Sequence, residues 1–206
     1  MHGGGYAGKI MMMFSEFMSW IDPTATSEAT TKETSGCPAG KARWGAGLLM
    51  GLLLSSSLKA AELTPSVLVP SQDTTPILTL QTSERQEQLS LASIERLPLY
   101  DATLQHPEGP EGTYSGVRLI DLLSAYDMEE ATRLRLTAVD NYSVFLDQKH
   151  LEEKDYLVVT RFDDAPVPRS QLGPLMLIVP ADEQAVLDGK VPYDKWIWAL
   201  TRINAS

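Results

Sequence analysis

The chain has 206 residues, with 27 acidic and 17 basic side chains and a formal net charge of −10. A chain this acidic lacks the basic surplus that neutralises phosphates, so nucleic-acid binding is disfavoured. It has one cysteine, which excludes an intramolecular disulfide, and three scattered histidines, which make a poor metal site.

The first 60 residues differ in composition from the rest. Residues 1–40 keep neither a helical nor a strand period, and we interpret them as an unstructured or mis-assigned N-terminal extension. Residues 41–60 are typical of a signal peptide, because Lys41 and Arg43 precede an apolar run over 44–54 and small residues follow. That run is shorter than the roughly 20 residues of a spanning helix. We therefore expect cleavage between Ala60 and Ala61, export to the periplasm and no permanent membrane span, with a buried apolar helix as the alternative.

Residues 61–206 hold 23 of the acidic and 12 of the basic side chains, and no cysteine. Prolines at 65, 70 and 76 predict an extended leader over 61–76. Alternating apolar and polar residues predict strands at 77–81 and 89–93, and a third strand is expected at 100–105. A helical turn is expected at 93–97, a turn-rich loop at 106–112, and a helix with one buried face at 117–126.

The second half of this region predicts more strands. Residues 132–139 alternate strictly, and the turn pair Asp140-Asn141 connects them to a returning strand at 142–146. A short helix or turn is expected at 148–154, and strands at 156–162, 175–179 and 196–204, with an acidic connection at 181–192. Many short strands with few helices predict a β-rich α+β domain over 77–206.

Four segments in this order resemble the oxidoreductase molybdopterin-binding domain, the fold of sulfite oxidase. They are 114–123 with its Gly-Val-Arg-Leu helix start, 136–143 ending in Asn-Tyr-Ser, the Gly-Pro strand 173–180, and the closing tryptophan-containing strand 195–203. The chain looks closest to short, secreted members that carry this domain alone. The resemblance implies a mixed-sheet or barrel-like domain with a few short helices, and molybdopterin or another pterin as cofactor.

One departure from the family concerns the metal. Family enzymes hold molybdenum through a cysteine that precedes the Gly-Val-x-Leu helix, but residues 97–112 contain none and Cys37 lies upstream of the signal peptide. Thr103 sits in about the right place to offer an oxygen. The standard molybdenum–thiolate site is therefore absent, no metal ligand is predicted, and catalytic residues stay unknown. The acidity of residues 61–206 also disfavours a large anionic cofactor.

The resemblance places two groups of residues near a cofactor. His106 lies in the region that faces it and could contact a phosphate or pterin, although an exposed loop histidine is the more common case. Asn141, Tyr142 and Ser143 form the turn that matches the family motif; they could line a pocket mouth, or simply supply turn geometry and packing.

Three further residues have two interpretations each. Arg169 could contact an anion, but a surface ion pair is commoner. Trp196 and Trp198 lie two apart, so in a strand they face the same side. We expect them in the core, with one of them able to stack on a flat ligand.

These observations lead to two functional hypotheses. The first is an exported binding module for a pterin, another ligand or a partner, in a periplasmic redox or signalling system with a membrane-bound component. The alternative is a molybdenum-dependent periplasmic oxidoreductase with non-cysteine ligation and an external electron acceptor. A fold alone does not choose between them, because function is carried by sites.

Overall fold

The structure is a computed structural model that describes residues 61–206. The expected N-terminal extension over 1–40 and signal peptide over 41–60 lie outside the described residues. No helix between residues 61 and 206 is both long and apolar enough to cross a membrane.

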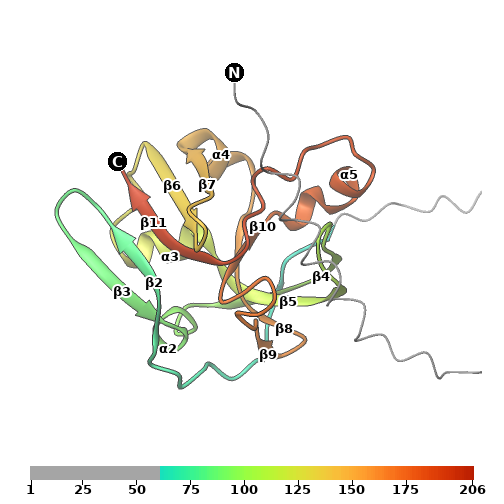
Figure 1. Ribbon diagram of the computed structural model, residues 1–206, viewed down its shortest axis with the longest axis horizontal. Helices are drawn as coiled ribbons and strands as arrows, with labels where there is room; N and C mark the ends of the chain where they lie inside the picture. The colour runs from blue at the N-terminus through green and yellow to red at the C-terminus, as the bar shows by residue number, and fades with distance from the viewer. Residues whose placement is uncertain (1–60) are drawn as a thin grey trace, which may run out of the picture. The chain divides into compact units, whose positions relative to one another are not determined.

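Two sheets form the described part of the chain (Figure 1). Sheet A has the order β1 (Thr64–Pro65), β4 (Leu99–Gln105), β5 (Glu111–Arg118), β8 (Leu157–Phe162) and β10 (Met176–Ile178), with β9 (Ala165–Pro166) paired to β8. Sheet B has the order β3 (Gln86–Ser90), β2 (Pro76–Gln81), β11 (Leu200–Ala205), β6 (Arg133–Ala138) and β7 (Ser143–Asp147). Neighbouring strands are antiparallel except for β2 and β11, which run parallel.

The helices within residues 61–206 are short and sit between strands. They are α2 (Leu91–Ile94), α3 (Leu119–Ala125), α4 (Gln148–Glu153) and α5 (Glu183–Leu187), with the 3-10 helix η2 (Pro180–Asp182) before α5. Ser90 caps α2, and Asp147 caps α4 by accepting the backbone N–H of His150 at 3.0 Å. The predicted strand-rich α+β class is confirmed.

One apolar core lies under both sheets. On β6, Leu134 and Leu136 are buried while Arg133 and Arg135 are exposed, which is the alternation that predicted this strand. Residues 157–160 of β8 are buried without alternation, because β8 lies inside sheet A between β5 and β10. Trp196 and Tyr114 are the largest of the fully buried side chains.

Several predicted boundaries are wrong. The strand β5 was not predicted, since Gly112, Ser115 and Gly116 break its apolar alternation, and the helix expected at 117–126 starts only at Leu119. Gly116 is needed there, because a Cβ at this position would lie 2.0 Å from the carbonyl oxygen of Val158 on β8. The helical turn expected at 93–97 lies at Leu91–Ile94, and the acidic connection at 181–192 contains α5.

An ion pair fastens the leader to sheet A. Arg161 on β8 donates from Nε and Nη2 to the two carboxylate oxygens of Glu95, at 3.0 and 2.6 Å. Glu95 also accepts the N–H of Ser71 at 2.6 Å, and Arg161 donates to the carbonyl of Val69 at 3.0 Å. Burial alone would raise the pKa of Glu95, but Arg161 and the Ser71 N–H outweigh burial and lower it below its usual value. The leader is therefore extended but anchored.

Candidate functional site

The loop that joins β4 to β5 holds His106 in place. Tyr114 donates its hydroxyl to the carbonyl of Pro110 at 2.7 Å, and the Gly109 N–H bonds to the His106 carbonyl at 3.2 Å. The side-chain amide of Gln105 donates to the carbonyls of His106 and Gly109, at 2.9 and 2.8 Å. This network fixes the geometry of the segment that the sequence predicted as a turn-rich loop.

His106 is buried, contrary to the expectation of an exposed loop histidine. Only 1% of it is exposed, because it continues the inward alternation of Ala102 and Leu104 on β4. Its ring centre lies 5.3 Å from that of Trp196, 6.0 Å from that of Tyr114 and 6.4 Å from that of Trp198. The histidine is thus the centre of an aromatic cluster.

Burial keeps the His106 ring uncharged. Removal from water lowers its pKa from 6.5 to about 4. The backbone N–H of Glu108 donates to Nδ1 of His106 at 3.1 Å. Since Nδ1 accepts this bond, the neutral ring carries its proton on Nε2.

Trp196 and Trp198 both approach His106, but they do not belong to a strand. Ile197 between them makes a single bridge to Leu177, and β11 begins only at Leu200 after Ala199, whose φ is 50°. Trp196 is 2% exposed, as expected of a core residue, whereas Trp198 is 37% exposed. The indole N–H of Trp196 has no acceptor within the described part of the chain.

Exposed rings lie next to this buried cluster. We call Tyr142, Tyr193 and Trp198 the aromatic rim; they are 51%, 38% and 37% exposed. Tyr193 donates its hydroxyl to Glu108 at 2.7 Å, which ties it to the His106 loop. Tyr142, on the turn before β7, reaches the carbonyl of Asp194 at 3.5 Å. The rim therefore unites a turn of sheet B, a loop of sheet A and the segment before β11.

The charge near the rim is negative. Glu108 accepts from Tyr193, and Asp140 accepts the backbone N–H of Tyr142 at 3.0 Å. Asp194 is paired with Lys195 at 3.3 Å. Glu108 and Asp140 thus have no cationic partner among residues 61–206. Such a surface favours uncharged or cationic rings over anionic ones.

The six predicted site residues divide into two groups. His106 and Tyr142 lie in or beside the aromatic cluster. Thr103 is exposed, bonds to Thr113 and points to the opposite face of β4 from His106, since odd and even positions alternate. Ser143 bonds to Arg135 on the outer face of sheet B.

Asn141 and Arg169 hold exposed loop positions. Asn141 adopts a left-handed φ of 69°, which asparagine tolerates better than most residues, so its role in the turn is geometric. Arg169 lies in the loop after β9 and makes neither an ion pair nor a side-chain hydrogen bond within the described residues. Tyr193 of the rim and its acceptor Glu108 were missed by sequence reasoning; the available signal was the three aromatic residues within 193–198.

The residues present do not fit a molybdenum centre of the family type. Residues 61–206 contain no cysteine and no cluster of three metal-binding side chains. Thr103 is turned away from His106, and the nearest carboxylates carry the same sign of charge as a pterin phosphate. We therefore derive no catalytic step through such a centre.

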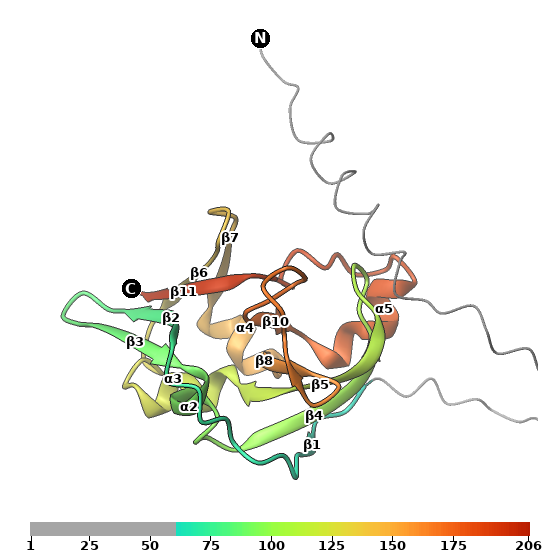
Figure 2. The same cartoon turned by 60° about the horizontal axis from the view of Figure 1, so that its bottom comes forward.

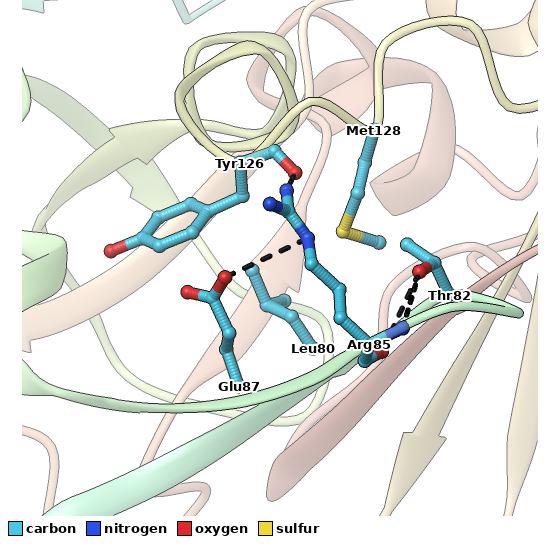
Figure 3. Close-up of a pocket in the computed structure, with 6 residues that line it drawn as sticks. All are labelled: Leu80, Thr82, Arg85, Glu87, Tyr126 and Met128. Carbon is cyan, nitrogen blue, oxygen red and sulfur yellow. Dashed lines mark hydrogen bonds and ion pairs between the residues drawn. The ribbon is translucent and has the colours of Figure 1, made fainter.

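A shallow hollow beside the β2–β3 hairpin is filled by its own side chains (Figure 3). Arg85 donates to the carbonyl of Tyr126, and it pairs with Glu87 at 3.6 Å and with Asp127 at 3.1 Å. Its Nε and Nη2 groups are thus already engaged by the chain itself, which leaves the aromatic cluster as the stronger candidate. Leu80, Thr82 and Met128 complete the lining.

Comparisons with protein-family models and with curated proteins give no match to this chain.

Proposed function

We propose that the chain is an exported binding module that recognises a flat, ring-containing ligand of the pterin type on its aromatic rim. The observation that carries the proposal is that exposed Trp198 lies 6.4 Å from the buried, neutral His106, while Tyr193 and Tyr142 are bonded to Glu108 in the His106 loop and to the carbonyl of Asp194. Tyr142 and Tyr193 are held by hydrogen bonds, which suits them to stacking because little side-chain freedom is lost on binding.

The proposal includes the type of fold. The four segments that resemble the sulfite oxidase domain, together with two sheets and few short helices, support a molybdopterin-binding-like fold used for binding. The missing thiolate and the acidic rim support a pterin ring without metal and without phosphate. In this proposal the module serves a periplasmic redox or signalling system and contacts a membrane-bound component of it.

Fluorescence titration of the full chain with free pterin and with a phosphorylated pterin tests the proposal. We expect saturable binding of the free pterin, and weaker binding of the phosphorylated form because Glu108 and Asp140 repel it. Loss of one stacking ring in Trp198→Ala should weaken binding about tenfold.

Phe145→Ala is the matched control, because Phe145 is a similarly exposed ring outside the rim, at 42%. It should leave pterin binding unchanged. Equal loss in both variants, or tighter binding of the phosphorylated form, would refute the proposed site. Stoichiometric molybdenum in protein purified from its own compartment would instead support the oxidoreductase.

A further inference from the structure

Two exposed arginines share one aromatic ring on the outer face of sheet B. Arg133 and Arg135 lie two residues apart on β6, so their side chains leave the same face. Their Cζ atoms lie 4.3 and 5.9 Å from the centre of the Phe145 ring on β7. Arg135 also donates from Nε to Ser143 at 3.1 Å. The ring and the hydroxyl therefore hold both guanidinium groups over β7.

Neither arginine forms an ion pair within residues 61–206, since Asp147, which lies opposite Arg133 in the β6–β7 register, bonds to His150 instead. This is unusual in a region with 23 acidic side chains and only 12 basic ones. Two like charges over one ring repel each other, and an anion placed beside them would relieve that repulsion. Guanidinium groups bind carboxylates through paired hydrogen bonds, so a carboxylate is a suitable anion.

The strand under these arginines is an edge strand. β7 ends the strand order of sheet B and pairs only with β6. It contains no proline, lysine or bulge, which are the usual devices that protect an edge. In Figure 2 the β6–β7 hairpin projects from the rest of the domain.

Hydrogen-bond alternation shows which main-chain groups of β7 are free. The N–H of Ala138 donates to the carbonyl of Tyr142 at 2.9 Å, which sets the phase of the ladder along the hairpin. In that phase Val144 and Leu146 bond to β6, whereas the N–H and C=O of Phe145 point away from it. The free peptide groups and the paired arginines thus coincide at Phe145.

We propose that the β7 edge binds an extended, acidic segment of a partner protein as an added strand, whose carboxylates pair with Arg133 and Arg135. An added strand would lie about 4.8 Å beyond β7, next to the guanidinium groups that Phe145 holds. Main-chain bonds to Phe145 supply affinity, and the arginines select acidic side chains.

Charge favours this occupant over two others. A second copy of the chain, pairing β7 with β7, would bring a second arginine pair against the first and add its own net charge of −10. A membrane of anionic lipid would face the acidic remainder of the domain as well as the two arginines. A narrow peptide avoids that repulsion, because charges more than about 10 Å away are screened at ordinary ionic strength.

Fluorescence anisotropy of the full chain with a dye-labelled, end-blocked peptide of alternating glutamate and valine tests the proposal. We expect saturable binding that weakens in high salt. The double variant Arg133→Gln with Arg135→Gln should weaken it at least about tenfold. Arg202→Gln is the matched control, because Arg202 is on the same sheet face but on β11, one strand further from the edge. It should change binding less than about twofold.

A copy of the peptide N-methylated at alternate residues keeps every charge but cannot pair along one edge, so it should not bind. This comparison uses the wild-type chain and holds even if the double variant fails to fold, which circular dichroism would show. Four results would overturn the proposal: no saturable binding below about 1 mM, equal loss with Arg202→Gln, unimpaired binding of the N-methylated peptide, or a concentration-dependent dimer that the double variant abolishes.

Discussion

Acidification should destabilise the domain through His106. In the unfolded chain this histidine takes up a proton near its ordinary pKa of 6.5, whereas burial lowers the folded pKa to about 4. Between these values the unfolded state binds more protons than the folded state, so the free energy of unfolding falls as the pH falls. Above the unfolded pKa both states are neutral and the contribution of His106 is fully present.

The magnitude follows from the shift. Each unit of difference in pKa corresponds to about 1.4 kcal/mol, so His106 alone should cost the fold roughly 2.5 kcal/mol near pH 4.5. His106→Phe removes this dependence and keeps a ring in the cluster. At neutral pH the variant should be less stable by about 1 kcal/mol, because the Glu108 N–H loses its acceptor. The two stability curves should therefore cross as the pH is lowered.

Urea unfolding of both proteins across this pH range, followed by circular dichroism, measures the difference directly. Comparing the two proteins cancels the titration of the carboxylates that they share. Tyr114→Phe is the control, because it perturbs the same cluster without removing the histidine, and its curve should run parallel to that of the wild type. If the curve of His106→Phe also ran parallel to the wild type, the assignment of a buried, neutral His106 would be wrong.

Two further predictions concern stability. Glu95→Gln should lower the free energy of unfolding by about 3–5 kcal/mol, because it leaves the partly buried guanidinium of Arg161 without its charge partner. The double change of Glu95→Leu with Arg161→Met should recover much of that stability in urea unfolding. A loss below about 1 kcal/mol for Glu95→Gln would mean that the pair contributes no more than a surface ion pair. Gly116→Ala should prevent folding, since its Cβ would lie 2.0 Å from the carbonyl oxygen of Val158. Gly189 has a φ of 69° and open space around it, so Gly189→Ala should lower the free energy of unfolding by only about 1 kcal/mol. Similar melting temperatures for the two glycine variants would contradict the close pairing of β5 with β8 at Gly116.

The sequence predicted the elements whose signal is local. Strict alternation located β6, and the Asp140-Asn141 pair located the turn to β7, both within two residues. It missed β5 because both faces of that strand are covered and Gly116 is there to admit a neighbouring backbone. Val158 on β8, which is distant in sequence, requires a glycine at position 116, and such a requirement leaves no periodic pattern in the sequence of β5.

The candidate site was predictable only in part, for a similar reason. His106 was singled out, but its burial depends on Trp196 and Tyr114, which lie 90 and 8 residues away and reach it through the tertiary fold. The family resemblance placed both Thr103 and His106 near a cofactor, yet strand alternation turns the two to opposite faces. Tyr193 belongs to no sequence motif, and its bond to Glu108 is what links it to the His106 loop.

The parallel pairing of β2 with β11 means that sheet B is completed only after β11 has been synthesised. Ile203 lies opposite Leu80, so the strand that joins the β2–β3 hairpin to the β6–β7 hairpin comes from the far end of the described chain. A ribosome or a translocation channel delivers β11 after every other strand, and until then sheet B is two separate hairpins. High contact order of this kind slows folding and postpones it until synthesis of β11 is finished.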